Sequence, residues 1–183
     1  MSRGPVPRRR RPAPLRGNDP LVTESWGTRL ARWRFNWFPA YRGTGARVTF
    51  IRRDWLEVRV TVPLSWRTRN YVGTIFGGSL YGAVDPVYML MLLRTLGPAY
   101  TVWDKAATIR FRRPGRTRLF AAFRLTEGVL EEIRHELTRT PKVDRAFQVE
   151  LVDAAGTVHA TIDKVIHVSL RAAGTGTAPA GSR

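Results

Sequence analysis

Between Asn70 and Asp85 the sequence places a polar amide, a glycine pair and a lone carboxylate inside an otherwise apolar stretch. The glycines are Gly77 and Gly78, and Asp85 follows seven residues after the second of them. A carboxylate in such surroundings is expected to have a specific structural or chemical role, because burying a charge without a partner is unfavourable. It is either a cap on a helix end or a group kept for acid-base or nucleophilic chemistry.

Each of these residues also has a purely structural interpretation. Asp85 followed by Pro86 is typical of a helix that starts there, or of a kink in a helix that began near Ser79. The glycine pair could form a tight turn with positive φ, or it could allow close packing of a helix on a sheet. Asn70 could bond to its own backbone at a turn. The local sequence alone leaves both interpretations open.

A nearly unbroken apolar run follows at residues 87–93, and the pattern stops at Gly97-Pro98. It predicts a buried central helix, over residues 79–96 if the helix begins before Asp85. Asp85 and Arg94 bound the run, so it falls well short of the roughly 18 apolar residues that a transmembrane helix needs. We therefore predict no membrane span.

The segments around this helix alternate as β-strands do, and they predict three hairpins. Their turns are Arg53-Asp54, the Pro-Gly-Arg sequence at 114–116, and the Asp-Ala-Ala-Gly sequence at 153–156. The paired ranges are 47–51 with 55–62, 108–112 with 119–125, and 145–152 with 158–170.

Helical spacing of apolar residues predicts two further helices, an N-terminal one over residues 21–36 and a short one over residues 129–139. The apolar residues of the first are Leu21, Trp26, Leu30, Trp33 and Trp37. With the hairpins, these elements predict an α+β fold in which an antiparallel sheet wraps around one long central helix.

The length of 183 residues suits one domain, which we place at 21–170. The flanking tails, a basic one at 1–20 and one of small residues at 171–183, lack apolar periodicity and are predicted to be disordered. The formal charge is +17, and residues 21–170 still carry 23 basic against 13 acidic residues. No recognition helix, zinc spacing or aromatic RNA-binding motif accompanies this charge, so nucleic-acid binding is not favoured. The absence of Cys allows a reducing compartment, and the cytoplasm is the default location.

The spacing resembles a motif of hotdog-fold acyl-CoA thioesterases of the phenylacetate-type branch. In that branch an Asn stands six residues before a His-Gly-Gly, and an acidic residue lies seven residues after the second Gly. Asn70, Phe76-Gly77-Gly78 and Asp85 reproduce this frame, and residues 109–116 resemble the strand and turn that follow the family's helix. Together with Trp103-Asp104-Lys105, the sequence looks most similar to the DUF4442 subgroup, over residues 35–170.

The resemblance implies a hotdog-fold homodimer, or a dimer of dimers, that hydrolyses an acyl-CoA thioester between its subunits. Asp85 would be the general base, or a nucleophile that forms an anhydride, and Asn70 would orient the water or the carboxylate. A backbone N–H at Gly77 or Gly78 would point at the thioester carbonyl oxygen.

The substrate would contact five further side chains. Two of them, Arg112 and Arg113, are candidates for the phosphates of coenzyme A, although a solvated strand face explains them equally well. Asp104 would be a second polar member of the site, or it would simply pair with Lys105 or an arginine. The full set is Phe76, Tyr81, Asp104, Arg112 and Arg113.

Phe76 departs from the family pattern, because many relatives have His at this position. The phenyl ring removes a hydrogen-bonding group that helps to place the substrate carbonyl, so a non-catalytic acyl-CoA or lipid binder is the alternative function. His135, His159 and His167 lie far along the chain, without the spacing of a metal site or a triad. We predict no metal and no cofactor.

Overall fold

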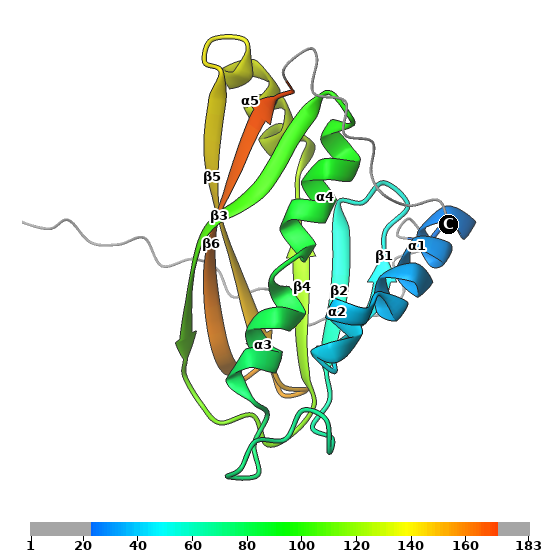
Figure 1. Ribbon diagram of the computed structural model, residues 1–183, viewed down its shortest axis with the longest axis vertical. Helices are drawn as coiled ribbons and strands as arrows, with labels where there is room; N and C mark the ends of the chain where they lie inside the picture. The colour runs from blue at the N-terminus through cyan, green and yellow to red at the C-terminus, as the bar shows by residue number, and fades with distance from the viewer. Residues whose placement is uncertain (1–22, 172–183) are drawn as a thin grey trace, which may run out of the picture.

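The computed structural model describes residues 23–171, and its centre is one six-stranded antiparallel sheet (Figure 1). The strands lie in the order β1-β2-β4-β5-β6-β3, so that β1 and β3 form the two edges. Except for Arg171, the predicted tails at 1–20 and 171–183 lie outside the described residues. The strands are β1 (Arg47–Ile51), β2 (Glu57–Val62), β3 (Tyr100–Phe111), β4 (Leu119–Arg124), β5 (Lys142–Val152) and β6 (Val158–Leu170).

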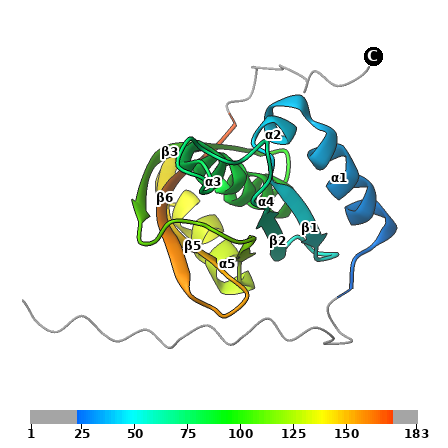
Figure 2. The ribbon, with the colours of Figure 1, turned by 90° about the horizontal axis from the view of Figure 1, so that it is seen from below.

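One kinked helix, made of α3 (Gly77–Val84) and α4 (Val87–Leu96), runs along the inner face of the sheet, which curves around it in Figure 2. Asp85 and Pro86 join the two pieces and keep right-handed helical dihedral angles. Pro86 explains the kink, because it has no N–H to donate to the preceding turn. No side chain caps α4, so the kink is the correct interpretation and Asp85 is not an N-cap.

The inner side of this helix supplies the middle of the hydrophobic core. Leu80 and Val84 of α3 and Met91 and Leu92 of α4 are almost completely buried. Burial of each such side chain contributes about 1.5–3 kcal/mol, which holds the helix on the sheet. The core therefore fixes where the kink lies relative to the strands.

Two N-terminal helices, α1 (Trp26–Trp37) and α2 (Pro39–Gly43), lie beside the β1 edge of the sheet (Figure 2). The Asn36 side chain donates to the Val48 carbonyl at 2.9 Å and accepts from the Val48 amide at 2.8 Å. Glu24 accepts a hydrogen bond from the Ile51 amide at 3.0 Å. These side chains satisfy edge groups that would otherwise be free to pair with another strand. Within residues 23–171 no strand pairs with the outer side of β3 at the opposite edge.

The remaining helix, α5 (Glu127–Leu137), connects β4 to β5 and confirms the short helix predicted at 129–139. Thr126 caps it by accepting from the Val129 amide, and Leu130, Ile133 and Leu137 enter the core. None of the helices within residues 23–171 combines the length and the apolar composition needed to cross a membrane.

The first and third predicted hairpins are confirmed by the β1–β2 and β5–β6 pairings. The second is wrong, because β3 pairs with β6 whereas β4 pairs with β2 and β5. Its predicted turn instead lies against the segment before α3, where the Gly115 carbonyl accepts from the Ile75 amide at 2.8 Å. A sheet that curves around one long helix, with this strand order, is the predicted α+β hotdog fold.

Candidate functional site

Asp85 lies at the kink of the central helix and binds a lysine that rises from the sheet. The Nζ atom of Lys164, on β6, lies 3.0 Å from the Asp85 carboxylate and also donates to the Asp85 backbone carbonyl. Lys164 occupies an inward position of β6, between the buried residues Ile162 and Ile166. Its ammonium has no solvent exposure, so these bonds to Asp85 replace water around the charge.

Asp104 of β3 approaches the same ammonium from the neighbouring strand, with its Oδ1 atom 2.8 Å from Nζ. A β-bulge places it there, because the β3–β6 register shifts between Asp104 and Ala106. Asp104 stands opposite Ile166 and Ala107 stands opposite Lys164, so both β3 residues share the inner face with the lysine. The bulge leaves the intervening residue, Lys105, free to turn outward and bind Asp144 at 2.5 Å.

The two carboxylates in this cluster have different surroundings. Burial raises the pKa of Asp104, the Lys164 ammonium offsets part of that rise, and the negative charge of Asp85 adds to it. The Asp104 Oδ1 atom lies within ion-pair distance of Nζ but receives no well-directed hydrogen bond. The Asp85 side chain is 40% exposed and that of Asp104 22% exposed. Asp85 is therefore the carboxylate that a substrate or a water reaches more easily.

Tyr81 lies one helical turn before Asp85, on the same side of α3. The centre of its ring is 5.9 Å from Lys164 Nζ. Burial raises the pKa of the Tyr81 phenol to about 12, and the neighbouring carboxylates of Asp85 and Asp104 add to the rise. The phenol therefore keeps its proton at neutral pH and can serve as a hydrogen-bond donor. Tyr81, Asp85 and Asp104, all predicted as site residues, come together around a residue that was not predicted, Lys164.

The glycine pair begins α3, next to two phenyl rings. A Cβ at Gly77 would lie 2.9 Å from Cζ of Phe111, and a Cβ at Gly78 would lie 2.3 Å from Cε1 of Phe76. Neither glycine has a positive φ, so close packing explains the pair and a left-handed turn does not. The first amides of a helix have no carbonyl of their own helix to bond, so these N–H groups can bind another acceptor.

Asn70 closes a turn within its own segment. Its side chain donates to the Thr74 hydroxyl and accepts from the Thr74 amide, both at 2.9 Å. Backbone bonds from Asn70 to the Thr74 carbonyl and from Gly73 to the Asn70 carbonyl complete the turn. The turn interpretation of Asn70 is thus confirmed within one chain, and one N–H of its side-chain amide is left for another acceptor.

The predicted phosphate-binding arginines lie just after β3, at the end of the strand away from Asp104. The backbone amides of Arg112 and Arg113 both donate to the His159 carbonyl, at 2.8 and 3.1 Å. Within residues 23–171 neither side chain forms an ion pair, and both residues are exposed. Arg110, by contrast, binds Asp163 and is occupied. His159 binds the Pro114 carbonyl and Asp153, which fits a structural residue.

Lys164 is the site residue that sequence reasoning missed, although the sequence contained a signal. It is one of three lysines in a chain whose basic residues are almost all arginine. It also occupies the inward phase of an alternating strand, in register with Ile162 and Ile166. A charged residue in that phase requires a buried partner of opposite charge. Asp104 does have a lysine partner, as one interpretation predicted, but the partner is Lys164 and not Lys105.

Comparisons with known proteins agree with this fold. The chain matches the family model described as a domain of unknown function, DUF4442, over residues 27–168. No curated protein sequence matches it.

Three solved structures resemble the chain at low sequence identity, which establishes a shared fold only. A Pseudomonas aeruginosa protein of unknown function, described as a probable thioesterase, is 21% identical with a TM-score of 0.69, covering 81% of this chain and 99% of that one. A Chlorobaculum tepidum protein of unknown function is 15% identical with a TM-score of 0.65, covering 84% and 100%. A thioesterase from Haemophilus influenzae is 14% identical with a TM-score of 0.59, covering 82% and 95%.

Proposed function

We propose that this chain, which belongs to the DUF4442 family, is a thioesterase-like hydrolase that cleaves an acyl-CoA thioester with Asp85. The observation that carries the proposal is the placement of Asp85 and Asp104 around the buried ammonium of Lys164. Apolar residues of the same volume often stabilise a fold as well as a buried ion pair does. A cluster of charged groups at a helix kink, with one carboxylate open to solvent, is typical of a site whose charges take part in binding or catalysis.

In the proposed reaction Asp85 acts as a general base toward water. The water oxygen attacks the thioester carbonyl carbon while its proton passes to the Asp85 carboxylate. The resulting oxyanion collapses, the C–S bond breaks, and the proton returns to the leaving thiolate. Direct attack by Asp85, which would form an anhydride, is the alternative route. Lys164 orients the carboxylate in both cases, because it binds Asp85 through two oxygens.

The amides of Gly77 and Gly78 are the proposed donors to the oxyanion. Gly78 and Asp85 are seven residues apart on one helix, which corresponds to about 10 Å along its axis. A separation of this size favours a site in which the glycine amides of one chain act with Asp85 of another chain. We therefore place the proposed site between two subunits.

The free edge of the sheet offers a way to form that dimer. Asn36 and Glu24 cover β1, whereas β3 has an unpaired outer side and exposed residues from Lys105 to Thr108. Pairing of two β3 strands would satisfy this edge and join two sheets into one. Asp104 of β3 and Phe111, which touches Gly77, would both lie close to such an interface.

The substrate class follows from the surfaces around the glycine pair. Phe76 and Phe111 present exposed phenyl rings that suit an acyl or aryl group. Arg112 and Arg113 follow Phe111 directly and offer guanidinium groups to the phosphates of coenzyme A.

One observation favours a second function, that of a non-catalytic acyl-CoA or lipid binder. The Phe76 ring packs against Gly78 and has no hydrogen-bonding group to help hold the thioester carbonyl. A binder would keep the apolar surface and the phosphate contacts without the chemical step.

The test is release of thiol from a panel of acyl-CoAs by the purified protein, followed with a thiol reagent. We expect turnover, and we expect Asp85→Asn to lower it by about 10²-fold or more, as loss of a general base does. The matched control is Asp144→Asn, because Asp144 binds Lys105 and His167 on the outer side of the sheet. Tight binding of acyl-CoA without thiol release would establish the binder instead, and equal turnover in both variants would remove Asp85 from the mechanism.

A further inference from the structure

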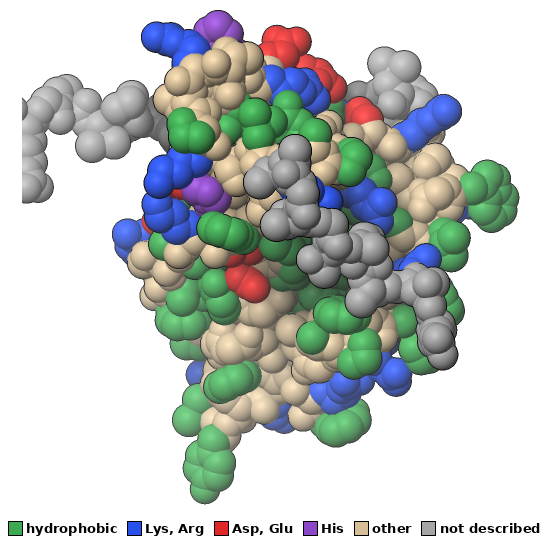
Figure 3. All heavy atoms as spheres, turned by 45° about the horizontal axis from the view of Figure 1, so that its top comes forward, with side chains coloured by type: hydrophobic (Ala, Val, Ile, Leu, Met, Phe, Trp, Pro, Cys, Tyr) green, Lys and Arg blue, Asp and Glu red, His purple; other side chains and the backbone are tan. Residues whose placement is uncertain are grey.

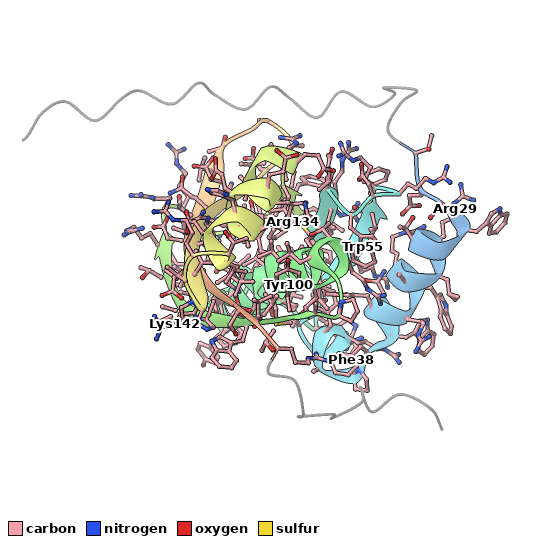
Figure 4. All side chains as sticks on the ribbon, turned by 90° about the horizontal axis from the view of Figure 1, so that it is seen from above. Arg29, Phe38, Trp55, Tyr100, Arg134 and Lys142 are labelled. Atoms are coloured by element: carbon pink, nitrogen blue, oxygen red, sulfur yellow. The ribbon has the colours of Figure 1, made fainter. Side chains whose placement is uncertain are left out.

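Helix α1 turns its apolar side away from the protein. Sequence spacing predicted an amphipathic helix here, and such a helix ordinarily buries its apolar stripe. In the structure Thr28 is the buried residue of α1, and Asn36, together with Glu24 just before the helix, binds β1. Phe35 is the one large apolar residue of α1 that packs inward, with its ring centre 4.4 Å from that of Tyr41. In Figure 4, Arg29 and Phe38 lie near the two ends of α1, and several side chains with rings project from this helix away from the sheet.

The outward stripe consists of large apolar side chains spaced along one side of the helix. Trp26 is 85% exposed, and each of the others is more than half exposed. Their spacing of four, three and four residues keeps them on one side over about 16 Å of helix. We call this set the α1 stripe: Trp26, Leu30, Trp33, Trp37 and the cap residue Phe38.

Guanidinium groups accompany the indole rings of this region. Arg29 lies over the Trp26 ring at 5.4 Å, and Arg42 lies over the Trp37 ring at 4.7 Å. Arg67 binds the Arg42 carbonyl at 3.0 Å and lies beside the exposed ring of Trp66, which extends the surface. Figure 3 shows hydrophobic side chains projecting at the edge where α1 lies, with basic side chains beside them.

Acidic side chains are missing from this part of the chain. Residues 25–53 contain seven arginines and no Asp or Glu. Glu24, just before α1, points inward and pairs with Arg32 at 2.9 Å. Residues 1–20 add six more arginines and one acidic residue, Asp19, to the sequence ahead of the helix. The α1 stripe with its neighbouring arginines therefore suits a partner that is both apolar and negatively charged.

We infer that the α1 stripe binds the surface of an anionic phospholipid bilayer. Tryptophan at the boundary between headgroups and acyl chains, with arginines beside it, is how interfacial helices bind. The helix would lie in the plane of the interface, with its indoles among the upper acyl chains and its guanidinium groups on lipid phosphates. This inference does not depend on the proposed hydrolysis.

Single-stranded nucleic acid fits the same charge but not the ring geometry. Bases stack on open aromatic faces that lie along a groove. Here arginines cover the Trp26 and Trp37 rings, and the Trp33 and Trp37 rings pack against each other at 5.9 Å with a tilt of 43°. The α1 stripe also lies on the outward surface of a helix, which does not form such a groove. These features favour an interface that accepts inserted side chains over a stacked strand.

The test is sedimentation of the full chain with vesicles of phosphatidylcholine alone or mixed with phosphatidylserine. We expect binding to the mixed vesicles only, and a loss of about tenfold or more in Trp33→Ser/Trp37→Ser, because two insertion anchors are removed. Trp103→Ser is the matched control, since Trp103 is 53% exposed on another part of the surface, against His167. Bromine-labelled acyl chains should quench the tryptophan fluorescence of the wild type more than that of the double variant.

Several results would overturn the inference. One is a wild type that binds neither kind of vesicle. Another is equal binding by wild type and Trp33→Ser/Trp37→Ser, which would assign the affinity to arginines elsewhere. A third is a double variant that changes the mass in analytical ultracentrifugation while vesicle binding stays the same, which would show that a second copy covers α1. The inference would also fail if Trp33→Ser/Trp37→Ser lost binding to RNA but kept its binding to vesicles.

Discussion

Lys164 ties the helix kink to the sheet, because its ammonium binds both the backbone carbonyl and the carboxylate of Asp85. The lysine comes from β6 and the aspartate from the joint between α3 and α4, 79 residues earlier in the chain. The position of the proposed base is thus set by a contact between the two main layers of the fold. Substitutions of Lys164 should therefore change both the free energy of unfolding and the turnover. Substitutions of exposed site residues such as Phe76 should change the turnover alone.

Lys164→Met should destabilise the fold substantially. The methionine fills a similar volume but leaves Asp104, which is largely buried, without its positive partner. We expect a loss of about 2–4 kcal/mol in the free energy of unfolding, measured by urea denaturation. Lys105→Met is the control, because it removes an exposed ammonium from the adjacent position of β3 and should leave the urea midpoint almost unchanged.

The double variant Lys164→Met/Asp104→Leu isolates the ion pair from the loss of packing. If the cost of Lys164→Met comes from the unpaired carboxylate, the second substitution should restore part of the stability. Additive losses in the two single variants would instead show that the two side chains stabilise the fold independently of their ion pair.

The raised pKa of Asp104 predicts a specific dependence of stability on pH. The native state holds this proton more tightly than the unfolded chain, in which the ordinary value is 3.8. The stabilisation from Asp104 is therefore fully present below that value and is lost as the pH rises through the higher native pKa. As the pH rises from about 4 through the native pKa of Asp104, the free energy of unfolding of the wild type should fall relative to that of Asp104→Asn.

Asp163→Asn provides a control of opposite sign for that experiment. Hydrogen bonds from Gln148 and Arg110 lower the pKa of Asp163, so its contribution is present at neutral pH and is lost as the pH falls. The wild type should therefore gain stability relative to Asp163→Asn as the pH rises. Parallel pH profiles for wild type and Asp104→Asn would contradict the assignment of a raised pKa to Asp104.

Phe76→His should increase thiol release if the phenyl ring limits catalysis. Phe76 is 57% exposed and precedes α3, so an imidazole there can be accommodated without disturbing the core. An added hydrogen-bonding group near the carbonyl should raise turnover by about tenfold or more. Trp66→His is the control, because Trp66 is an exposed aromatic residue that the proposed catalytic site does not include. Equal gains in the two variants would show that position 76 has no special function.

The central helix and two hairpins were predictable because their signals are local. The apolar run after Asp85 and the turns at residues 53–54 and 153–156 each lie within one segment. The prediction of a hairpin between β3 and β4 was wrong, because a Pro-Gly turn shows that the chain changes direction but not which strands pair with each other. In this fold β3 pairs along its length with β6, which starts 47 residues after β3 ends. That choice depends on long-range pairing, which no local pattern encodes.

The candidate site was predictable in part for the same reason. The spacing predicted Gly77, Gly78, Tyr81 and Asp85 along one helix, and in the structure α3 contains the first three and ends at Asp85, its C-cap residue. Lys164 lies on the last strand, so only the register of β6 against β3 reveals that it meets Asp104. The outward direction of the α1 stripe was equally hidden, because periodicity identifies an apolar side without saying which way it faces.

Ala107→Glu should dissociate the proposed dimer. Ala107 is exposed at the middle of β3, and two copies pairing about a two-fold axis would bring like charges together across the new ladder. We expect analytical ultracentrifugation to show a shift from dimer to monomer. Ala155→Glu, in the exposed turn between β5 and β6, carries the same charge and should leave the mass unchanged. A monomeric wild type would contradict the proposed interface directly.

Co-expression of two inactive variants tests whether one site uses two chains. Asp85→Asn lacks the proposed base, and Gly78→Val places a side chain where only 2.3 Å separates its Cβ from the Phe76 ring. If Gly78 of one subunit acts with Asp85 of the other, each mixed dimer keeps one intact site. About a quarter of the wild-type sites should then be active, because half of the randomly formed dimers are mixed. If both groups acted within one chain, every site would carry one defect and co-expression would restore no thiol release.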